Sequence, residues 1–159
     1  MQHQTSFETA RGISDVEVSH GHALIVVTGF NEAEESAKRL EALRVLASAG
    51  YSIDFLKLAL GGFSFVVQES AALDIEKCLS EAGFDAKAIQ RRSLITVRAP
   101  NIRDESGLVA RIAQTVVASD ASIESVGDMH SAVLLVVHSA VADRAGEALR
   151  GLIGKVDIL

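Results

Sequence analysis

The sequence contains few of the residue types that mark secreted or nucleic-acid-binding proteins. Cys78 is the only cysteine, which excludes an intrachain disulfide, and we expect a cytoplasmic protein. Tryptophan is absent and tyrosine occurs once, so aromatic platforms for stacking nucleic-acid bases are lacking. The 15 Lys and Arg residues are outnumbered by 21 Asp and Glu residues and are scattered along the chain. We therefore expect no binding to nucleic acid.

Long hydrophobic runs are also missing. The longest apolar stretches, such as residues 133–137, fall far short of the roughly 20 residues that span a bilayer. The first twenty residues contain no apolar run of the kind found in secretion signals. We therefore expect neither a membrane association nor an exported protein. At 159 residues the chain can form one ordinary domain or two small ones without help from metals or disulfides.

What the sequence does contain is an internal repeat at a shift of 70 residues, and its register holds without a gap. Solenoid repeats have periods of about 20–50 residues, so a period of 70 indicates two copies of a small domain. The matched positions include Leu24 with Leu94, Ile25 with Ile95, Val27 with Val97, Asn31 with Asn101, Ile53 with Ile123 and Leu79 with Leu149.

Each copy shows the same order of predicted elements, which is strand, helix, strand, strand, helix, strand. In the first copy the strands are 23–28, 51–60, 63–68 and 86–89, the helices are 34–49 and 71–82, and Gly61-Gly62 forms the hairpin turn. In the second copy the strands are 94–98, 122–129, 132–138 and 156–159, and the helices are 107–118 and 141–152. Residues 13–19 alternate like an additional strand before a turn at His20-Gly21-His22.

This order predicts an α+β fold made of two ferredoxin-like βαββαβ units in tandem, each an antiparallel sheet with its helices on one face. The expected divisions are 1–22 for a tail and lead-in strand, 23–91 for the first unit and 92–159 for the second. Such a sheet leaves its other face half covered. We therefore expect the two units to share a sheet or a helical layer.

At this level the sequence resembles tandem ACT domains, in particular the C-terminal regulatory region of aspartokinases. Gly12-Ile13 followed by the strand at 23–29 is similar to the entry of that region. The segment Ser-Gly-Leu-Val-Ala-Arg-Ile at 106–112 looks like the family's Pro-Gly-Val-Ala-Ala-Arg helix opening. The segment Ala-Ser-Ile-Glu-Ser at 121–125 looks like its Ile-Asn-Ile-Glu-Met strand opening. The resemblance covers about residues 12–159.

The resemblance implies a regulatory protein that binds a free amino acid at the boundary between paired domains, and it implies a homodimer. We expect no catalytic domain, because only a short polar tail precedes Gly12. Some aspartokinases carry a separate regulatory subunit of about this extent, which makes a separate kinase chain a possible partner. No cofactor is expected, and no enzymatic activity.

A ligand site is expected at the loop that opens the first helix of the second copy. The free N–H groups and the positive dipole end of a helix suit a carboxylate, Gly107 allows close approach, and Asp104 could hold an ammonium group. Polar groups where the second strand of either copy begins would complete the site. The candidate ligand-binding residues are Asn101, Asp104, Ser106, Gly107, Leu108, Ser52, Ile53, Asp54, Ser122 and Ile123.

Simpler interpretations of these residues stay open. Asp104 or Ser106 could only cap the helix, and Gly107 could only allow helix and sheet to pack. In the first copy Ala37 replaces the glycine. Three acids, Glu32, Glu34 and Glu35, crowd the loop there, which puts a first site in doubt and suits solvated residues of a helix start.

Other residues carry weaker signals. His20 and His22 could form a metal pair, but no carboxylate or cysteine lies at a supporting spacing, so a solvated turn is favoured. Motifs of the types GxSxG, HExxH and CxxC are absent. Two alternatives to the sensing function remain, which are a dimerisation module that has lost effector binding and a stand-alone enzyme built on the ferredoxin-like scaffold.

Overall fold

The computed structural model describes residues 11–102 and 105–155, and these form one antiparallel sheet of six strands in the order β2-β3-β1-β4-β6-β5. No helix in these two ranges is both long and apolar enough to cross a membrane. The strands are β1 (Asp15–Thr28), β2 (Asp54–Ala59), β3 (Gly62–Gln68), β4 (Asp85–Arg98), β5 (Ser125–Asp128) and β6 (Ala132–His138). The helices are α1 (Glu35–Ser48), η1 (Glu69–Ala71), α2 (Ala72–Glu81), α3 (Leu108–Ala118) and α4 (Ser139–Arg150).

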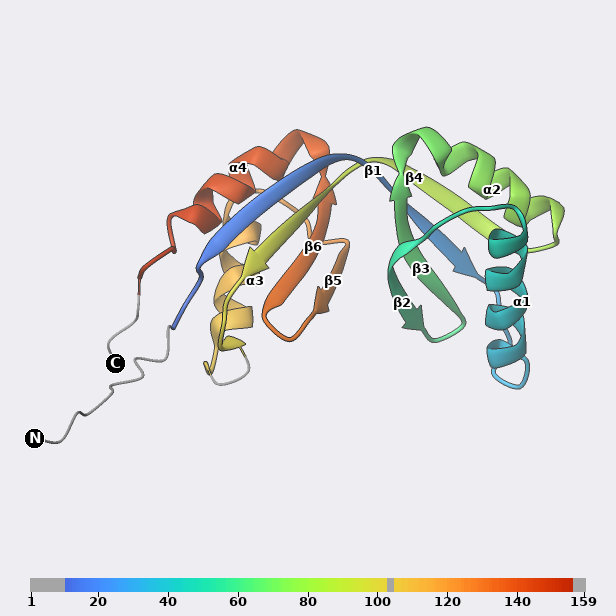
Figure 1. Cartoon of the computed structure of the whole chain (residues 1–159), viewed down its shortest axis with the longest axis horizontal. Helices are drawn as coiled ribbons and strands as arrows, with labels where there is room; N and C mark the ends of the chain where they lie inside the picture. The colour runs from blue at the N-terminus through green and yellow to red at the C-terminus, as the bar shows by residue number, and fades with distance from the viewer. Residues whose placement is uncertain (1–10, 103–104, 156–159) are drawn as a thin grey trace, which may run out of the picture.

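Strands β1 and β4 run through the whole molecule and divide it into two halves (Figure 1). They pair antiparallel from Asp15 opposite Arg98 to Thr28 opposite Asp85. The first half contains α1, β2, β3 and α2, with the later part of β1 and the earlier part of β4. The second half contains α3, β5, β6 and α4, with the remaining parts of β1 and β4. Of the two expected arrangements, a shared sheet or a shared helical layer, the structure has the shared sheet.

Each half has its own hydrophobic core between its helices and the sheet. Helices α1 and α2 cover the first core, and α3 and α4 cover the second (Figure 1). The apolar residues of each helix recur at three- and four-residue spacing, which directs them to one side. The first core includes Ile25, Val27, Leu46, Phe63, Phe65, Ile75 and Leu79. The second includes Val16, Ile95, Val97, Ile112, Val116, Leu135 and Leu149.

A small third cluster joins the halves on the opposite face of the sheet, beneath the arch seen in Figure 1. Leu24, Val66 and Val136 form its buried centre, and Phe55 packs against them. The ring of Phe55 lies so close to Gly127 that a Cβ at Gly127 would stand 2.4 Å from Cε2 of that ring. We call this contact region the seam. It holds β2 of one half against β5 of the other.

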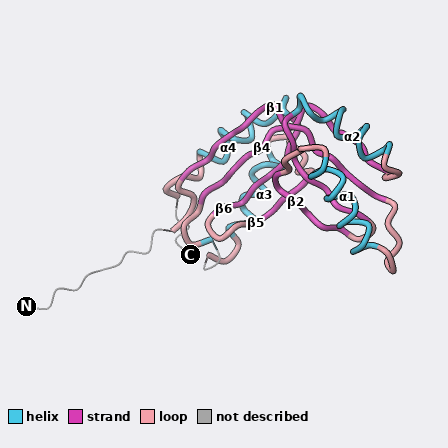
Figure 2. The backbone as a smooth tube through the Cα atoms, turned by 45° about the vertical axis from the view of Figure 1, so that its right-hand side comes forward, coloured by secondary structure: helices cyan, strands magenta, loops and turns pink. Residues whose placement is uncertain are grey.

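Both spanning strands are irregular where the halves meet, and Figure 2 shows β1 and β4 side by side across this bend. The register of β1 against β4 shifts on either side of His22. Gly21 in β1 has a φ of +78°, and Arg91 in β4, which is 70 residues later, has a φ of +55°. The repeat therefore places one left-handed residue in each spanning strand. We call the region around Gly21 and Arg91 the bend.

The element prediction was wrong about how these strands connect. The predicted strands 13–19 and 23–28 are joined in one strand, β1, which begins at Asp15, and the predicted turn at His20-Gly21-His22 is a bulge within it. The predicted strands 86–89 and 94–98 are likewise one strand, β4. Pairing over the full length of β1 and β4 outweighs the local turn signal of Gly21, because a bulge accommodates a left-handed residue without ending the strand.

Other element ends moved by a few residues. The predicted strand 122–129 is limited to β5, the predicted strand 51–60 is limited to β2, and the hairpin turn lies at Leu60 and Gly61, with Gly62 already in β3. The predicted strand 156–159 lies outside the described residues. Residues 94–98 of β4 pair with residues 15–19 of β1.

Candidate functional site

The loop expected to bind a ligand connects the end of β4 to the start of α3. Gly107 is the residue before α3, with a φ of +81°, and as the N-cap residue it has no side chain that could cap the helix. The N-cap position is held by Gly107 and not by Ser106, and Asp104 lies outside the described residues. A Cβ on Gly107 would have no atom within 4 Å, so close packing does not explain this glycine. The left-handed φ of Gly107 explains why a glycine occupies this position.

The described part of this loop is tied to the start of the chain. The backbone N–H of Gly12 donates to Oε2 of Glu105 over 2.7 Å, and Nη2 of Arg111 lies 3.9 Å from Oε1 of the same carboxylate. At the loop's other end, the pKa of Arg98 is raised by its hydrogen bonds to Glu17 and to Asp15. Arg98 therefore stays charged at any physiological pH.

Of the remaining predicted residues that the structure describes, Asn101 lies in this loop and Leu108 directly follows it, whereas the residues of the two strand openings do not join it. Asn101 is half-buried in the loop, whereas the side chain of Leu108 is buried in the second core. Ser52, Asp54 and Ser122 are exposed, and Ile53 and Ile123 pack against the first and second cores.

The strand openings instead lie toward the seam. The N–H of Glu124 donates to the carbonyl of Val136, whereas the Gly107 loop follows Arg98, which pairs with Ala132 four residues away along β6. Four residues of strand span about 13 Å, so Glu124 and Arg98, the residue at which the loop leaves β4, lie at different ends of β6. In the first half Asp54 pairs with Val66, which belongs to the seam. The starts of β2 and β5 therefore face each other across the seam. The loops before α1 and α3 lie at the ends of the two halves that are far from the seam.

A hollow of about 170 Å³ is present at the corresponding loop of the first half, where the sequence had put a site in doubt. On one side of the hollow are the end of β1 and the start of α1. On the other side is the chain segment that leads from α2 into β4. Phe30 and Phe84 form an aromatic wall, with ring centroids 6.1 Å apart at an interplanar angle of 74°. Its lining residues are Thr28, Gly29, Phe30, Asn31, Glu34, Lys38, Ala82, Gly83, Phe84 and Asp85.

The hollow carries charges of both signs. Glu34 and Asp85 supply carboxylates, and Lys38 supplies an ammonium group. Thr28 donates from Oγ1 to Oδ2 of Asp85 over 3.4 Å, a long hydrogen bond that helps to orient this carboxylate. No side chain caps α1, so the first N–H groups of the helix and its positive dipole end point toward the loop. The site therefore offers partners for a carboxylate and for an ammonium group.

Glu35 does not contribute to this hollow, and the expectation that it is solvated was wrong. Its carboxylate accepts hydrogen bonds from the backbone N–H of Gly61 and from Nη2 of Arg39, the latter over 2.6 Å. Arg39 also donates from Nε to the carbonyl of Gly62 over 3.0 Å. Glu35 therefore fastens α1 to the β2-β3 hairpin. Its repeat counterpart is Glu105, which in the same way accepts from a backbone N–H.

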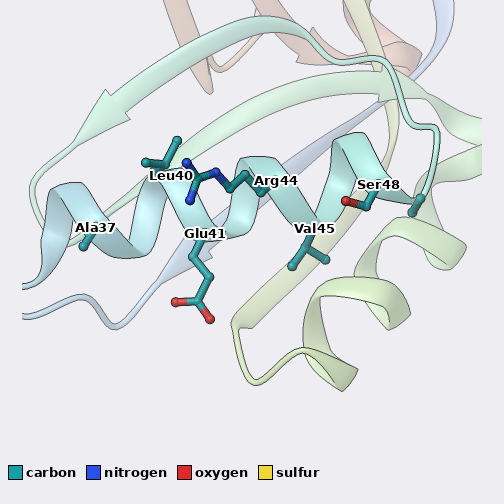
Figure 3. A pocket seen from close by; sticks show the side chains of 7 residues that line it. Ala37, Leu40, Glu41, Arg44, Val45 and Ser48 are labelled. Carbon is teal, nitrogen blue, oxygen red and sulfur yellow. The ribbon is translucent and has the colours of Figure 1, made fainter.

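A second, open groove follows the outer face of α1 (Figure 3). Leu40 and Arg44 lie along one side of it, and Glu41 and Val45 along the other (Figure 3). The same half exposes further apolar side chains, because Leu58 on the edge strand β2 is 63% exposed and Leu60 is fully exposed. Residues of this kind on a free sheet edge are typical of a protein contact.

The described residues contain no group of three or more His, Cys, Asp or Glu side chains that could hold a metal ion. His20 and His22 do not form a pair, because each has its own partners. His22 is hydrogen-bonded through Nε2 to Ser19, and His20 is hydrogen-bonded to Ser93 and Asp143. Both histidines belong to the bulge of β1 and not to a turn; His22 is buried, whereas the side chain of His20 is 47% exposed.

The fold of this chain is that of the regulatory subunits and regulatory domains of aspartate kinase. The structure of the regulatory subunit from Thermus flavus matches with a TM-score of 0.80 at 16% identity, over 89% of this chain and 98% of that one. The ligand-free regulatory subunit from Thermus thermophilus matches with a TM-score of 0.78 at 18% identity, over 92% of this chain and 99% of that one.

The same fold forms part of a longer enzyme chain. Aspartokinase III from E. coli, in complex with lysine and aspartate, matches with a TM-score of 0.72 at 11% identity, over 93% of this chain and 34% of that one. No protein-family profile matches the chain, and no curated protein matches its sequence. These likenesses concern the fold.

Proposed function

We propose that this protein is a non-catalytic regulatory module that binds a free amino acid and acts on a separate aspartate kinase chain. The proposed organisation is two ACT-like units, 23–91 and 92–159, after a tail and lead-in strand at 1–22. Residues 15–19 of that lead-in strand would complete the second unit. The fold shared with separate regulatory subunits of aspartate kinase supports this proposal.

The observation that carries the ligand proposal is the hollow beside α1. Its volume of about 170 Å³ is below the roughly 300–1,000 Å³ of drug-sized pockets, which suits one small molecule. Lys38 and the start of α1 would bind the carboxylate of an amino acid, and Asp85 with Glu34 would bind its ammonium group. Phe30 and Phe84 would contact its side chain. The Gly107 loop is the proposed equivalent in the second half, with Asn101 and Ser106 beside it.

Thermal unfolding with single free amino acids tests this proposal, and lysine is the first probe because a structure with this fold was solved with it. A ligand at about 100 times its Kd adds about 2.7 kcal/mol to the free energy of unfolding. For a chain of this size that raises Tm by roughly 5–10 °C. Threonine, methionine and isoleucine complete the panel.

Two variants locate the site. Lys38→Ala and Asp85→Asn should each reduce the ligand-induced shift in Tm. Lys77→Ala is the matched control, because Lys77 is also a helix lysine paired with a nearby glutamate but lies on α2, away from the hollow. A panel without any shift would contradict amino-acid binding. An unchanged shift in Lys38→Ala and Asp85→Asn would contradict this location.

A second candidate function is supported by the exposed apolar surface of the first half. Leu58 pairs with Phe63 of the first core and so lies on the helix side of the sheet, and it is 63% exposed, as Leu56 is at 41% and Leu40 of α1 at 49%. We propose that a second copy of this chain covers them by pairing its own β2 edge antiparallel to this one. Glu41 and Arg44 on α1 would then face Arg44 and Glu41 of the second copy.

Sedimentation of Leu58→Lys tests this pairing. The wild-type chain should sediment as a dimer and Leu58→Lys as a monomer, because the charge would be buried without a partner. Leu73→Lys is the control, because Leu73 is 59% exposed on α2, outside the proposed contact. A dimer that binds no amino acid would favour a module that serves assembly alone. A wild-type monomer would contradict both the pairing and the homodimer.

A further inference from the structure

Phe55 in β2 has a backbone conformation that its residue type disfavours. Among the described residues, the non-glycine residues with a left-handed φ are Phe55 at +53°, Arg91 at +55° and Asp120 at +59°. Arg91 lies in the irregular part of β4 at the bend, and Asp120 follows α3 as an aspartate, a residue type that tolerates this region. For a bulky aromatic residue such a φ is an outlier, and it persists only where surrounding contacts hold it.

The left-handed residue belongs to a bulge in β2. The register of β2 against β3 shifts between Asp54 and Lys57. Phe55 and Leu56 therefore lie together opposite the single residue Phe65. In bulges whose first residue is left-handed, that residue is normally a glycine, because a Cβ is strained there. Phe55 thus occupies a position that suits glycine.

The second copy of the repeat shows that the fold does not require this bulge. Ser125 is the residue 70 positions after Phe55, and β5 pairs with β6 without any register shift. Ser125 lies directly opposite Val136, and its φ is not left-handed. At the equivalent place in the first copy Asp54 lies opposite Val66, so the bulge has moved the pairing by one residue. The cause of the bulge is therefore specific to the first copy.

The ring of Phe55 differs from Ser125 in lying against the other half of the molecule. Strands β2 and β5 face each other on the inner side of the arch (Figure 1). The ring packs on the seam cluster and on buried Gly127 of β5, where a Cβ would overlap it. The φ of Gly127 is not left-handed, so the closeness of the ring explains this glycine. The contact crosses from one half to the other.

Two opposing effects act on Phe55. Burial of its ring against the seam favours the bulged strand, because apolar surface is removed from water. The left-handed φ disfavours the bulged strand, because the Cβ of Phe55 is crowded by the backbone. A strand that lacked the contact with Gly127 would keep the strain and lose the burial.

We propose that Phe55 is a register switch, in which its contact with Gly127 holds β2 in the bulged register. Loss of the contact lets β2 take the regular register of β5. Phe55 then lies opposite Val66, as Ser125 lies opposite Val136, and its φ becomes extended. The segment 52–54 moves by one residue along β3. Because β2 is an edge strand, a movement of the halves that parts the seam changes the edge that a partner meets.

Nuclear magnetic resonance tests the switch, because Overhauser contacts between backbone protons of paired strands report the register. In the wild-type chain we expect contacts between residues 54 and 66, and a coupling constant of residue 55 that reports a left-handed φ. Gly127→Val fills the place of the ring without changing β2, so contacts between residues 55 and 66 should replace those between 54 and 66. Asp128→Val is the matched control and should keep the bulge. Asp128 is exposed and pairs with Val133 of the second core, so it lies on the other face of β5.

Phe55→Ser keeps the test decisive if Gly127→Val does not fold. It introduces the residue of the second copy and removes the ring without changing β5. A regular register in Phe55→Ser, with a bulge in Asp128→Val, supports the switch. A bulge that persists in Phe55→Ser or in Gly127→Val would overturn it, since β2 alone would then fix the conformation. A regular register in the wild type or in Asp128→Val would also overturn it. The register is measured within one chain, so neither result depends on amino-acid binding.

Discussion

Replacing Gly127 by alanine should destabilise the protein through one contact at the seam. The new Cβ would lie 2.4 Å from Cε2 and 2.9 Å from Cζ of Phe55, whereas carbon atoms in contact are normally about 3.5–4.0 Å apart. The ring cannot swing away freely, because it packs against the seam cluster and Nζ of Lys57 lies 5.9 Å from its centroid. Overpacking of this kind costs about 1–3 kcal/mol.

A double-mutant cycle assigns this cost to the contact between the halves. In a Phe55→Ala background the ring is gone, so Gly127→Ala should then cost no more than the glycine-to-alanine change itself. The expected coupling energy is about 1–2 kcal/mol. Urea unfolding measures all four proteins, and each kcal/mol corresponds to roughly 2–4 °C in Tm for a chain of this size. Equal costs of Gly127→Ala in both backgrounds would refute the contact, and with it the seam.

Further predictions concern single residues. Asp120 follows α3 with a φ of +59°, at the position where Gly50 follows α1 with a φ of +80°. Asp120→Gly should therefore raise the free energy of unfolding by about 0.5–1 kcal/mol, and Gly50→Ala should lower it by about 1 kcal/mol. Urea unfolding measures both. Nδ1 of His138 accepts from the N–H of Ala140 over 3.0 Å at the start of α4, so His138→Ala should cost about 1 kcal/mol, whereas exposed His130→Ala should be neutral. Glu35→Ala should cost about 1.5–3 kcal/mol because it leaves Arg39 and the Gly61 N–H without their carboxylate, whereas exposed Glu32→Ala should change little.

Local patterns in the sequence predicted the helices and most strands within a few residues. Helix 34–49 differs from α1 by one residue at each end, and the strand 132–138 agrees with β6. Gly50 and Gly83 marked helix ends correctly, because both have left-handed φ values that end a helix. The repeat added the expectation that the two copies share a sheet or a helical layer, which no single element could provide.

The connections between distant segments could not be predicted in this way. The lead-in strand at 13–19 showed the right alternation, but nothing local indicates that it pairs with residues 94–98. The acid Glu35 looked solvated because the Gly61 N–H that binds it lies 26 residues away in sequence. His20 and His22 showed only a turn signal, since Ser93 and Asp143 are 73 and 123 residues from His20. Charge and periodicity report on neighbours along the chain, and these partners meet only in the folded sheet.

Because both halves share β1, the order in which they can fold during synthesis is set. The first half needs nothing beyond about residue 92, so it can fold while the rest of the chain is still being translated. The second half needs β1 residues made at the outset to meet β4 residues made up to 83 positions later, as Asp15 meets Arg98. Such distant pairings slow folding, and until they form the early segment presents an unpaired edge. A stalled or truncated nascent chain would therefore hold one finished half beside a strand without its partner.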